Sequence, residues 1–147
     1  MSSKQRNDVR VVHVDASQRA TLRHQTLEIL ELEHHRFDAF ADRTPAEQMA
    51  AAEIFRDAFD VLDATGWDAG DSESPGDVPL TAGHVELLKA RRCDLVLAIA
   101  DRLVERDQLP APAEIAALHT ANLLDRAVIR DLAEVIARFH GAERPSL

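Results

Sequence analysis

The amino-acid sequence predicts an all-α fold, specifically a four-helix bundle built from two antiparallel αα-hairpins. Three observations support this prediction. Apolar residues recur at helical spacing in four long segments of the chain. Two of these segments begin with the same Pro-Ala-Glu triplet, at residues 45–47 and 112–114. The connections before both triplets are short, and short connections make consecutive helices antiparallel neighbours. Three shared residues leave open whether the hairpins are an internal repeat.

The N-terminal segment, residues 1–14, is predicted to be flexible or extended. Residues 9–14 read VRVVHV, a short β-branched run that favours a strand. A lone strand cannot satisfy its own backbone, so this segment must pair with another chain or lie extended across the bundle. The 147 residues make one ordinary domain. We assign residues 15–141 to a single four-helix domain and residues 142–147 to a tail.

The first hairpin is predicted from its capping residues. Asp15 and Gln18 form a capping box, which starts a helix expected to run over residues 16–42. The next helix has an N-cap at Thr44, directly before a Pro-Ala-Glu triplet, and a glycine cap at Gly66. Four apolar residues are expected to form the buried face of this second helix: Ala52, Phe55, Phe59 and Leu62.

A long acidic loop is predicted at residues 67–80, which combine acids, glycines and prolines. The second hairpin follows, with one helix starting near Thr81 and the other near Pro112. Both helices are apolar around more than half of their circumference. Three large aliphatic residues therefore lie away from the main apolar faces: Leu97, Val104 and Leu123. This surplus apolar surface favours a dimer.

The composition excludes several classes of protein. The net charge is −9, and the 17 basic residues are scattered among acids, so no basic stripe is available for nucleic acid. No stretch approaches the length of apolar sequence that a membrane-spanning helix needs. Cys93 is the only cysteine, which excludes an internal disulfide and favours a cytoplasmic protein. We interpret Cys93 as a small buried residue, and we expect no cofactor.

Charged and polar residues on the predicted apolar faces are the first candidates for a site. Glu33, Arg92 and Asp125 interrupt the apolar faces of three different helices, with Asn122 beside Asp125. In an up-down bundle all of them lie near one level, where an arginine fork between two carboxylates satisfies the geometry. One interpretation is a structural ion network that fixes the register of the helices. The other is a pocket for a small polar ligand.

A metal site is a further hypothesis. Glu31 and His34 have the Glu-x-x-His spacing that carboxylate-bridged di-iron bundles use on their metal-binding helices. Such bundles need a second Glu-x-x-His, and the sequence contains none. A solvated helical face with ordinary ion pairs four residues apart explains the same residues.

The sequence favours a non-enzymatic protein that acts by self-association, as a homodimer, or by binding a protein partner. The argument is that four long amphipathic helices are predicted while no catalytic constellation emerges. The alternative is a helical bundle that binds a small ligand or a metal, with enzymatic activity left open, through Glu33, Arg92, Asp125 and His34.

Overall fold

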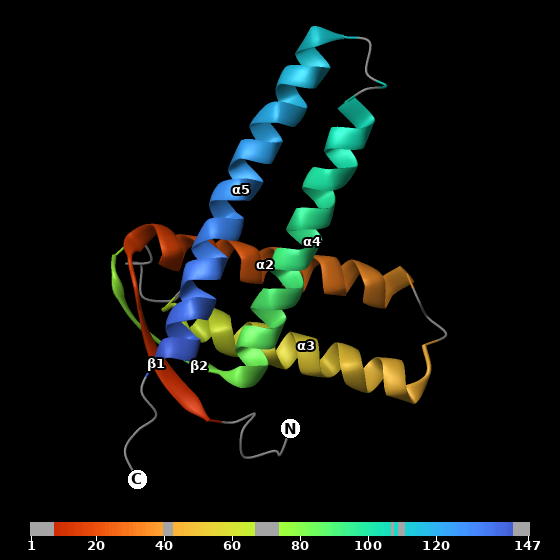
Figure 1. The fold of residues 1–147 in the computed structure, drawn as a ribbon. Helices are drawn as coiled ribbons and strands as arrows, with labels where there is room; N and C mark the ends of the chain where they lie inside the picture. The colour runs from red at the N-terminus through yellow and green to blue at the C-terminus, as the bar shows by residue number, and fades with distance from the viewer. Residues whose placement is uncertain (1–7, 40–42, 67–73, 107, 109–110, 143–147) are drawn as a thin grey trace.

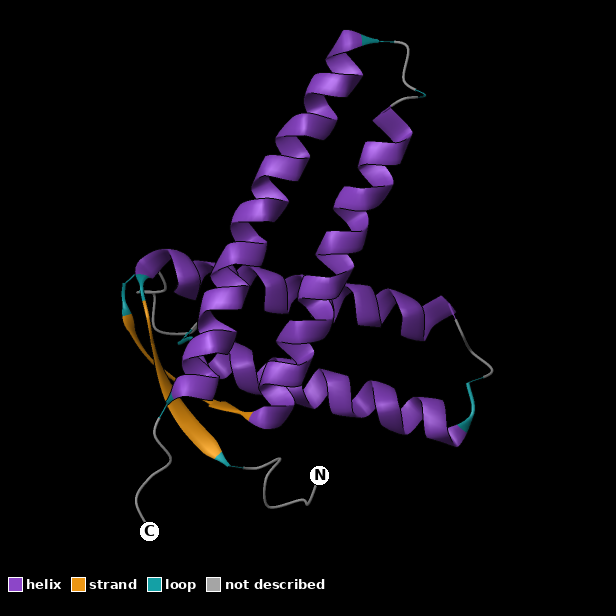
Figure 2. Ribbon diagram, viewed as in Figure 1, coloured by secondary structure: helices purple, strands orange, loops and turns teal. Residues whose placement is uncertain are grey.

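The protein is mostly helical, as predicted, with a small two-stranded sheet in addition. The computed structural model describes residues 8–39, 43–66, 74–106, 108 and 111–142, without the side chains of residues 37–39. In the described residues, strands and helices follow one another in the order β1 (Val9–Val14), α2 (Ala16–Ala39), α3 (Pro45–Ala64), β2 (Gly76–Thr81), α4 (Ala82–Arg106) and α5 (Pro112–Gly141). The strands lie together at one end of the molecule, beside the C-terminal end of α5 (Figure 2).

The strand at Val9–Val14 finds its partner within the chain. It pairs antiparallel with β2, with Val12 opposite Val78 and Val11 opposite Pro79. The prediction of a loop over residues 67–80 is therefore wrong for its last five residues, 76–80, which belong to β2. Proline is rare inside strands, and Pro79 hid the alternation of buried Val78 and Leu80. Pro79 is tolerated because a two-stranded sheet consists only of edges.

Each strand leads into a helix through the same kind of capping box. The Gln18 N–H donates to Asp15 Oδ1 at 2.8 Å, and the Asp15 N–H donates to Gln18 Oε1 at 3.1 Å. The His84 N–H donates to Thr81 Oγ1 at 3.2 Å, and the Thr81 N–H donates to His84 Nδ1 at 3.1 Å. Both pairs are offset by 66 residues (81 − 15 and 84 − 18). A strand, a capping box and two helices thus occur twice along the chain.

The helices pack as neighbours in chain order, α2 against α3 and α4 against α5. The α4/α5 pair crosses the α2/α3 pair steeply and extends well beyond it (Figure 1). Only one end of the α4/α5 pair therefore lies among the other elements. No described helix has the length and the run of apolar residues needed to cross a membrane.

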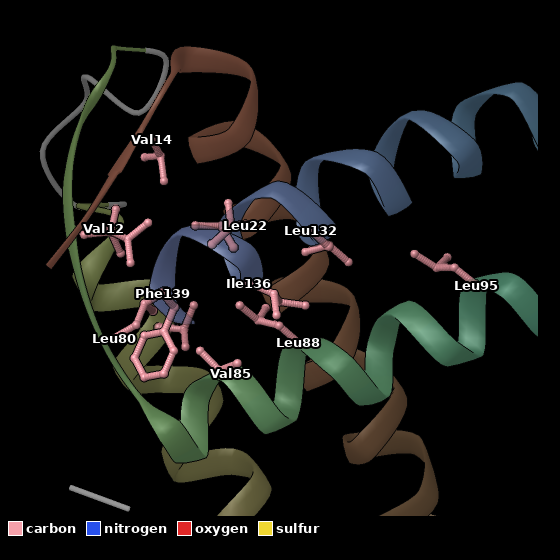
Figure 3. Packing of buried hydrophobic residues seen from close by; sticks show 13 residues of the cluster. Val12, Val14, Leu22, Leu80, Val85, Leu88, Leu95, Leu132, Ile136 and Phe139 are labelled. Atoms are coloured by element: carbon pink, nitrogen blue, oxygen red, sulfur yellow. The ribbon is translucent and has the colours of Figure 1, made fainter. Parts of the chain in front are cut away.

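The hydrophobic core lies where the sheet meets α2 and the inner ends of α4 and α5 (Figure 3). Side chains from both strands pack there against α2, α4 and α5. The labelled members of this cluster in Figure 3 are Val12, Val14, Leu22, Leu80, Val85, Leu88, Leu95, Leu132, Ile136 and Phe139. Leu95 is the outermost of them along α4. The core therefore ends near the middle of α4.

The buried face of α3 differs from the prediction. Leu62 is buried as expected, but Ala52 is exposed and Phe59 is 53% exposed. The other buried residues of α3 are Ala51, Ala58 and Val61. Small alanine side chains therefore form much of the buried face, while Phe55 is half-buried and Phe59 points outward.

The predicted helix ends at this hairpin are confirmed where the structure describes them. Thr44 is the N-cap of α3, accepting a hydrogen bond from the Glu47 N–H at 3.2 Å. Gly66 follows α3 with a φ of 72°, a left-handed conformation that glycine adopts without strain. The structure describes α2 as far as Ala39. Four parts of the prediction lie outside the described residues: the continuation of the first helix to residue 42, the loop residues 67–73, the tail from 143, and residues 1–7.

Candidate functional site

The candidate site lies on the projecting part of the α4/α5 hairpin. We call this part the arm and define it as residues 96–106 of α4 and 112–125 of α5. Asn122 is the only buried residue of the arm. All five buried residues of α4 precede the arm, and four of the five buried residues of α5 follow it. The arm therefore has no apolar core of its own.

Large aliphatic side chains are exposed on the arm. The predicted surplus residues Leu97, Val104 and Leu123 are 61%, 67% and 53% exposed. Three further aliphatic residues of the arm are also exposed: Val96, Leu103 and Leu124. Half of the twelve exposed large hydrophobic residues in the described chain thus belong to these two short segments. Exposed apolar surface at this density is typical of an interaction site.

A polar cluster joins the two helices of the arm. Arg102 of α4 forms a hydrogen-bonded ion pair with Asp125 of α5. The same guanidinium donates to Asn122 Oδ1 at 3.4 Å. Asn122 and Asp125, two of the residues predicted to form a polar cluster, are therefore brought together. The arginine that joins them is Arg102 and not the predicted Arg92. The partly buried ion pair fixes the register of α4 against α5.

Glu33 belongs to a separate cluster, at the α2/α3 hairpin. Its side chain is 8% exposed and lies 3.5 Å from Arg43 Nη1 and 3.8 Å from Arg36 Nη1. Arg43 is itself buried, with a side chain 10% exposed, whereas the side chain of Arg36 is 64% exposed. This pair connects α2 to the residue just before the N-cap of α3. Its geometry is that of a structural ion pair.

Arg92 is half-buried on α4 and forms an ion pair with neither Glu33 nor Asp125 in the described part of the chain. Glu33, Arg92 and Asp125 were expected at one level of an up-down bundle. The steep crossing of the two helix pairs removes that common level (Figure 1). A sequence signal indicates Arg102 as the polar residue on this face, because it lies one heptad after buried Leu95.

A groove opens along the seam of the arm, between the end of α4 and the beginning of α5. Its volume is about 420 Å³. Arg102, Arg106 and Asn122 contribute polar groups to its wall, and Leu103, Ile115 and Leu118 contribute apolar ones. Of these three apolar residues, Ile115 and Leu118 are half-buried and Leu103 is exposed. They line an open groove because no further element packs over the arm.

Comparisons with known proteins do not place this chain in a family. No family model, curated protein or solved structure matches it. The site is therefore defined by this chain's own geometry.

One group of three metal-ligating side chains is present among the described residues, at the junction of α3 and α4. Ligand atoms of Asp57, Asp60 and His84 lie within 4.8 Å of one another. However, His84 Nδ1 accepts the Thr81 N–H, so the neutral imidazole carries its proton on Nε2, which lies 3.5 Å from Asp60 Oδ2. A metal-bound histidine shows the opposite pattern, donating its second N–H to an acceptor. This geometry fits a capping histidine beside Asp60 better than a metal centre.

The predicted metal ligands Glu31 and His34 are both exposed on α2. In the described part of the chain, they belong to no group of three ligands whose atoms converge. Glu31 instead lines a second groove, together with His35 and Asp94. The metal site at Glu31 and His34 stays a prediction without support from the surrounding residues.

Cys93 differs from its interpretation as a buried residue. It is exposed on α4, three residues before the arm begins. Its position, four residues before Leu97, places it on the same side of the helix as that exposed leucine. Its thiol is therefore close to the exposed apolar surface of the arm.

Proposed function

We propose that this protein acts by self-association, as a homodimer that forms through the arm of its two-hairpin scaffold. The observation that supports the proposal is a set of six exposed aliphatic side chains on a segment with no buried apolar residue. Monomeric proteins rarely expose a continuous apolar patch larger than a few hundred Å². Most of the stability of helices in proteins comes from packing an apolar face, and the arm lacks such packing.

A second copy of the chain is a suitable partner for the arm. Two arms packed together contain four helices, which is the arrangement of a four-helix bundle. Most homo-oligomers are two-fold dimers, in which both copies use the same surface. A standard interface covers about 800 Å² per partner.

We further propose a cytoplasmic location. The argument is the single exposed thiol of Cys93, which lies close to the proposed interface and stays reduced in the cytosol. No catalytic residue is assigned, because the described polar clusters are ion pairs and capping interactions rather than a nucleophile with an adjacent base.

The proposal is tested by measuring the mass of the protein in solution over a range of concentrations. Light scattering should give twice 16.3 kDa for the unchanged chain. The double substitution Leu97→Glu, Val104→Glu places two charges on the exposed surface of the arm. It should give a monomer with unchanged helical circular dichroism, since both side chains are more than 60% exposed.

Leu27→Glu is the matched control. Leu27 is also an exposed leucine, but it lies on α2 at 43% exposure, away from the arm. This variant should remain a dimer. A chain that is monomeric at all concentrations contradicts the proposal. A double variant that stays dimeric shows that the interface lies elsewhere.

A further inference from the structure

The groove in the seam of the arm has the properties of a small-molecule site. Its volume of about 420 Å³ lies within the usual range for ligand pockets, roughly 300–1,000 Å³. It is lined by residues of both helices, so a bound molecule contacts α4 and α5 at once. The groove lies in the seam between the two helices, and Leu103 is the one side chain that it shares with the exposed aliphatic surface proposed for the dimer.

Asn122 presents an unused hydrogen-bond donor to this groove. The residue is 8% exposed, and its Oδ1 accepts the hydrogen bond from Arg102. Its amide Nδ2 has no acceptor among the residues that the structure describes, and it is not sealed off from the groove. The donor faces the open groove, where water satisfies it until a ligand displaces that water. An acceptor atom of a ligand satisfies this donor.

The charged groups of the groove are all basic. Arg106 lies one helical turn after Arg102 and forms no ion pair with any described residue. His119 also lines the groove, and no aspartate or glutamate is among the described residues of its lining. The groove between α2 and α4, in contrast, includes Glu31 and Asp94. In a chain of net charge −9, a groove that offers donors and positive charge without a carboxylate favours an anionic ligand.

The remaining wall of the groove is apolar. Leu103, Ile115 and Leu118 form this wall, while Asn122 and Arg106 contribute polar groups to the same groove. Aliphatic side chains of this kind bury the hydrocarbon part of a ligand, and hydrogen-bond donors fix its polar end. A fully charged, hydrophilic anion such as inorganic phosphate leaves this wall unused.

We propose that the groove binds an organic monocarboxylate with a short hydrocarbon body. Arg106 and the Asn122 amide hold the carboxylate as donors, while Arg102 stays paired with Asp125 and orients Asn122. The hydrocarbon lies against Leu103, Ile115 and Leu118. The ligand joins α4 to α5 and fills the seam that the arm's own side chains leave open.

The test measures binding of hexanoate to the full chain by isothermal titration calorimetry, with 1-hexanol and acetate as comparison ligands. Hexanoate should bind more tightly than both, since only hexanoate carries both the carboxylate and the hydrocarbon. Arg106→Gln should weaken hexanoate binding roughly 10-fold or more, as expected for the loss of a charge-assisted hydrogen bond. Asn122→Asp should weaken it as well, because the new carboxylate faces the ligand while still accepting from Arg102.

Arg126→Gln is the matched control, because Arg126 is an exposed arginine of α5 outside the groove lining. It should bind hexanoate as the unchanged chain does. Equal affinity for hexanoate and 1-hexanol, or an unchanged affinity in Arg106→Gln, overturns the proposal. Light scattering of the same samples separates the two proposals, since a monomer that binds hexanoate contradicts only the dimer.

Discussion

Val12 and Val78 lie directly opposite each other in the two-stranded sheet, and both are buried. They are 66 residues apart (78 − 12), which is the offset between the two capping boxes. A shift of 66 residues therefore takes Val12 to its own partner in the sheet and takes Asp15 to Thr81. This offset relates the strand and capping box of one half of the chain to those of the other. The two-stranded sheet joins the halves, which also meet through α2 against α5 and α3 against α4.

Shortening either valine should destabilise the protein. Val12→Ala and Val78→Ala should each lower the free energy of unfolding by about 2 kcal/mol, because each removes a fully buried side chain from the core. The two losses should not be additive, since the side chains are paired. Urea unfolding measures both. Val11→Ala is the control, because Val11 is 59% exposed, and it should change stability by less than about 0.5 kcal/mol.

The two capping boxes should be interchangeable in chemistry. His84→Gln gives the second half the residue that Gln18 supplies in the first, and Thr-x-x-Gln is a standard capping box. We expect it to keep most of the stability. His84→Ala loses the cap and leaves a space at a residue only 7% exposed, so it should cost at least about 1 kcal/mol. If the unfolding temperature of His84→Gln is as low as that of His84→Ala, the two capping boxes are not equivalent.

The buried ion pair of Glu33 should depend on one arginine and not on the other. Arg43→Met should lower the free energy of unfolding by about 3 kcal/mol, because it leaves a buried carboxylate without its buried partner. Arg36→Met should cost less than about 1 kcal/mol, since the Arg36 side chain is 64% exposed and solvent screens the pair. Chemical denaturation compares the two variants directly. Equal losses would show that Arg36 supports Glu33 as strongly as Arg43 does.

Zinc should not stabilise the protein through Asp57, Asp60 and His84. The Thr81 N–H occupies His84 Nδ1, and the protonated Nε2 offers no lone pair to a metal. We expect the unfolding temperature to be the same with and without excess Zn²⁺. If Zn²⁺ raises the unfolding temperature of the unchanged chain but not that of His84→Gln, the His84 ring flips to bind the ion.

The helices were predictable because their signals are local. The caps at Thr44 and Gly66 act within one helical turn, and the structure confirms both. The strand at β2 was missed because its pairing partner lies on the other side of the first hairpin, more than sixty residues away. No local pattern reports such a pairing, and Pro79 argued against it.

The candidate site was predictable only in part. Asn122 and Asp125 were identified as polar residues on an apolar face, and the structure brings both to one guanidinium. Their partner was missed because Arg92 was placed at their level in the bundle. That placement assumed that the axes of all four helices are aligned, as in an up-down bundle. The steep crossing of the helix pairs is a tertiary arrangement that helical projection alone does not predict (Figure 1). The exposure of Leu97 and Val104 was correctly anticipated.

The arm also bears on how the molecule opens. The arm carries one buried residue, whereas the core residues come from both strands, from α2 and α3, and from the inner ends of α4 and α5. Amide hydrogen exchange follows cooperative units whose opening free energies rise with their buried contacts. We therefore expect two such units, a slowly exchanging base and a distal hairpin that opens on its own. A partner or ligand on the distal hairpin protects those amides and leaves the exchange of the base unchanged.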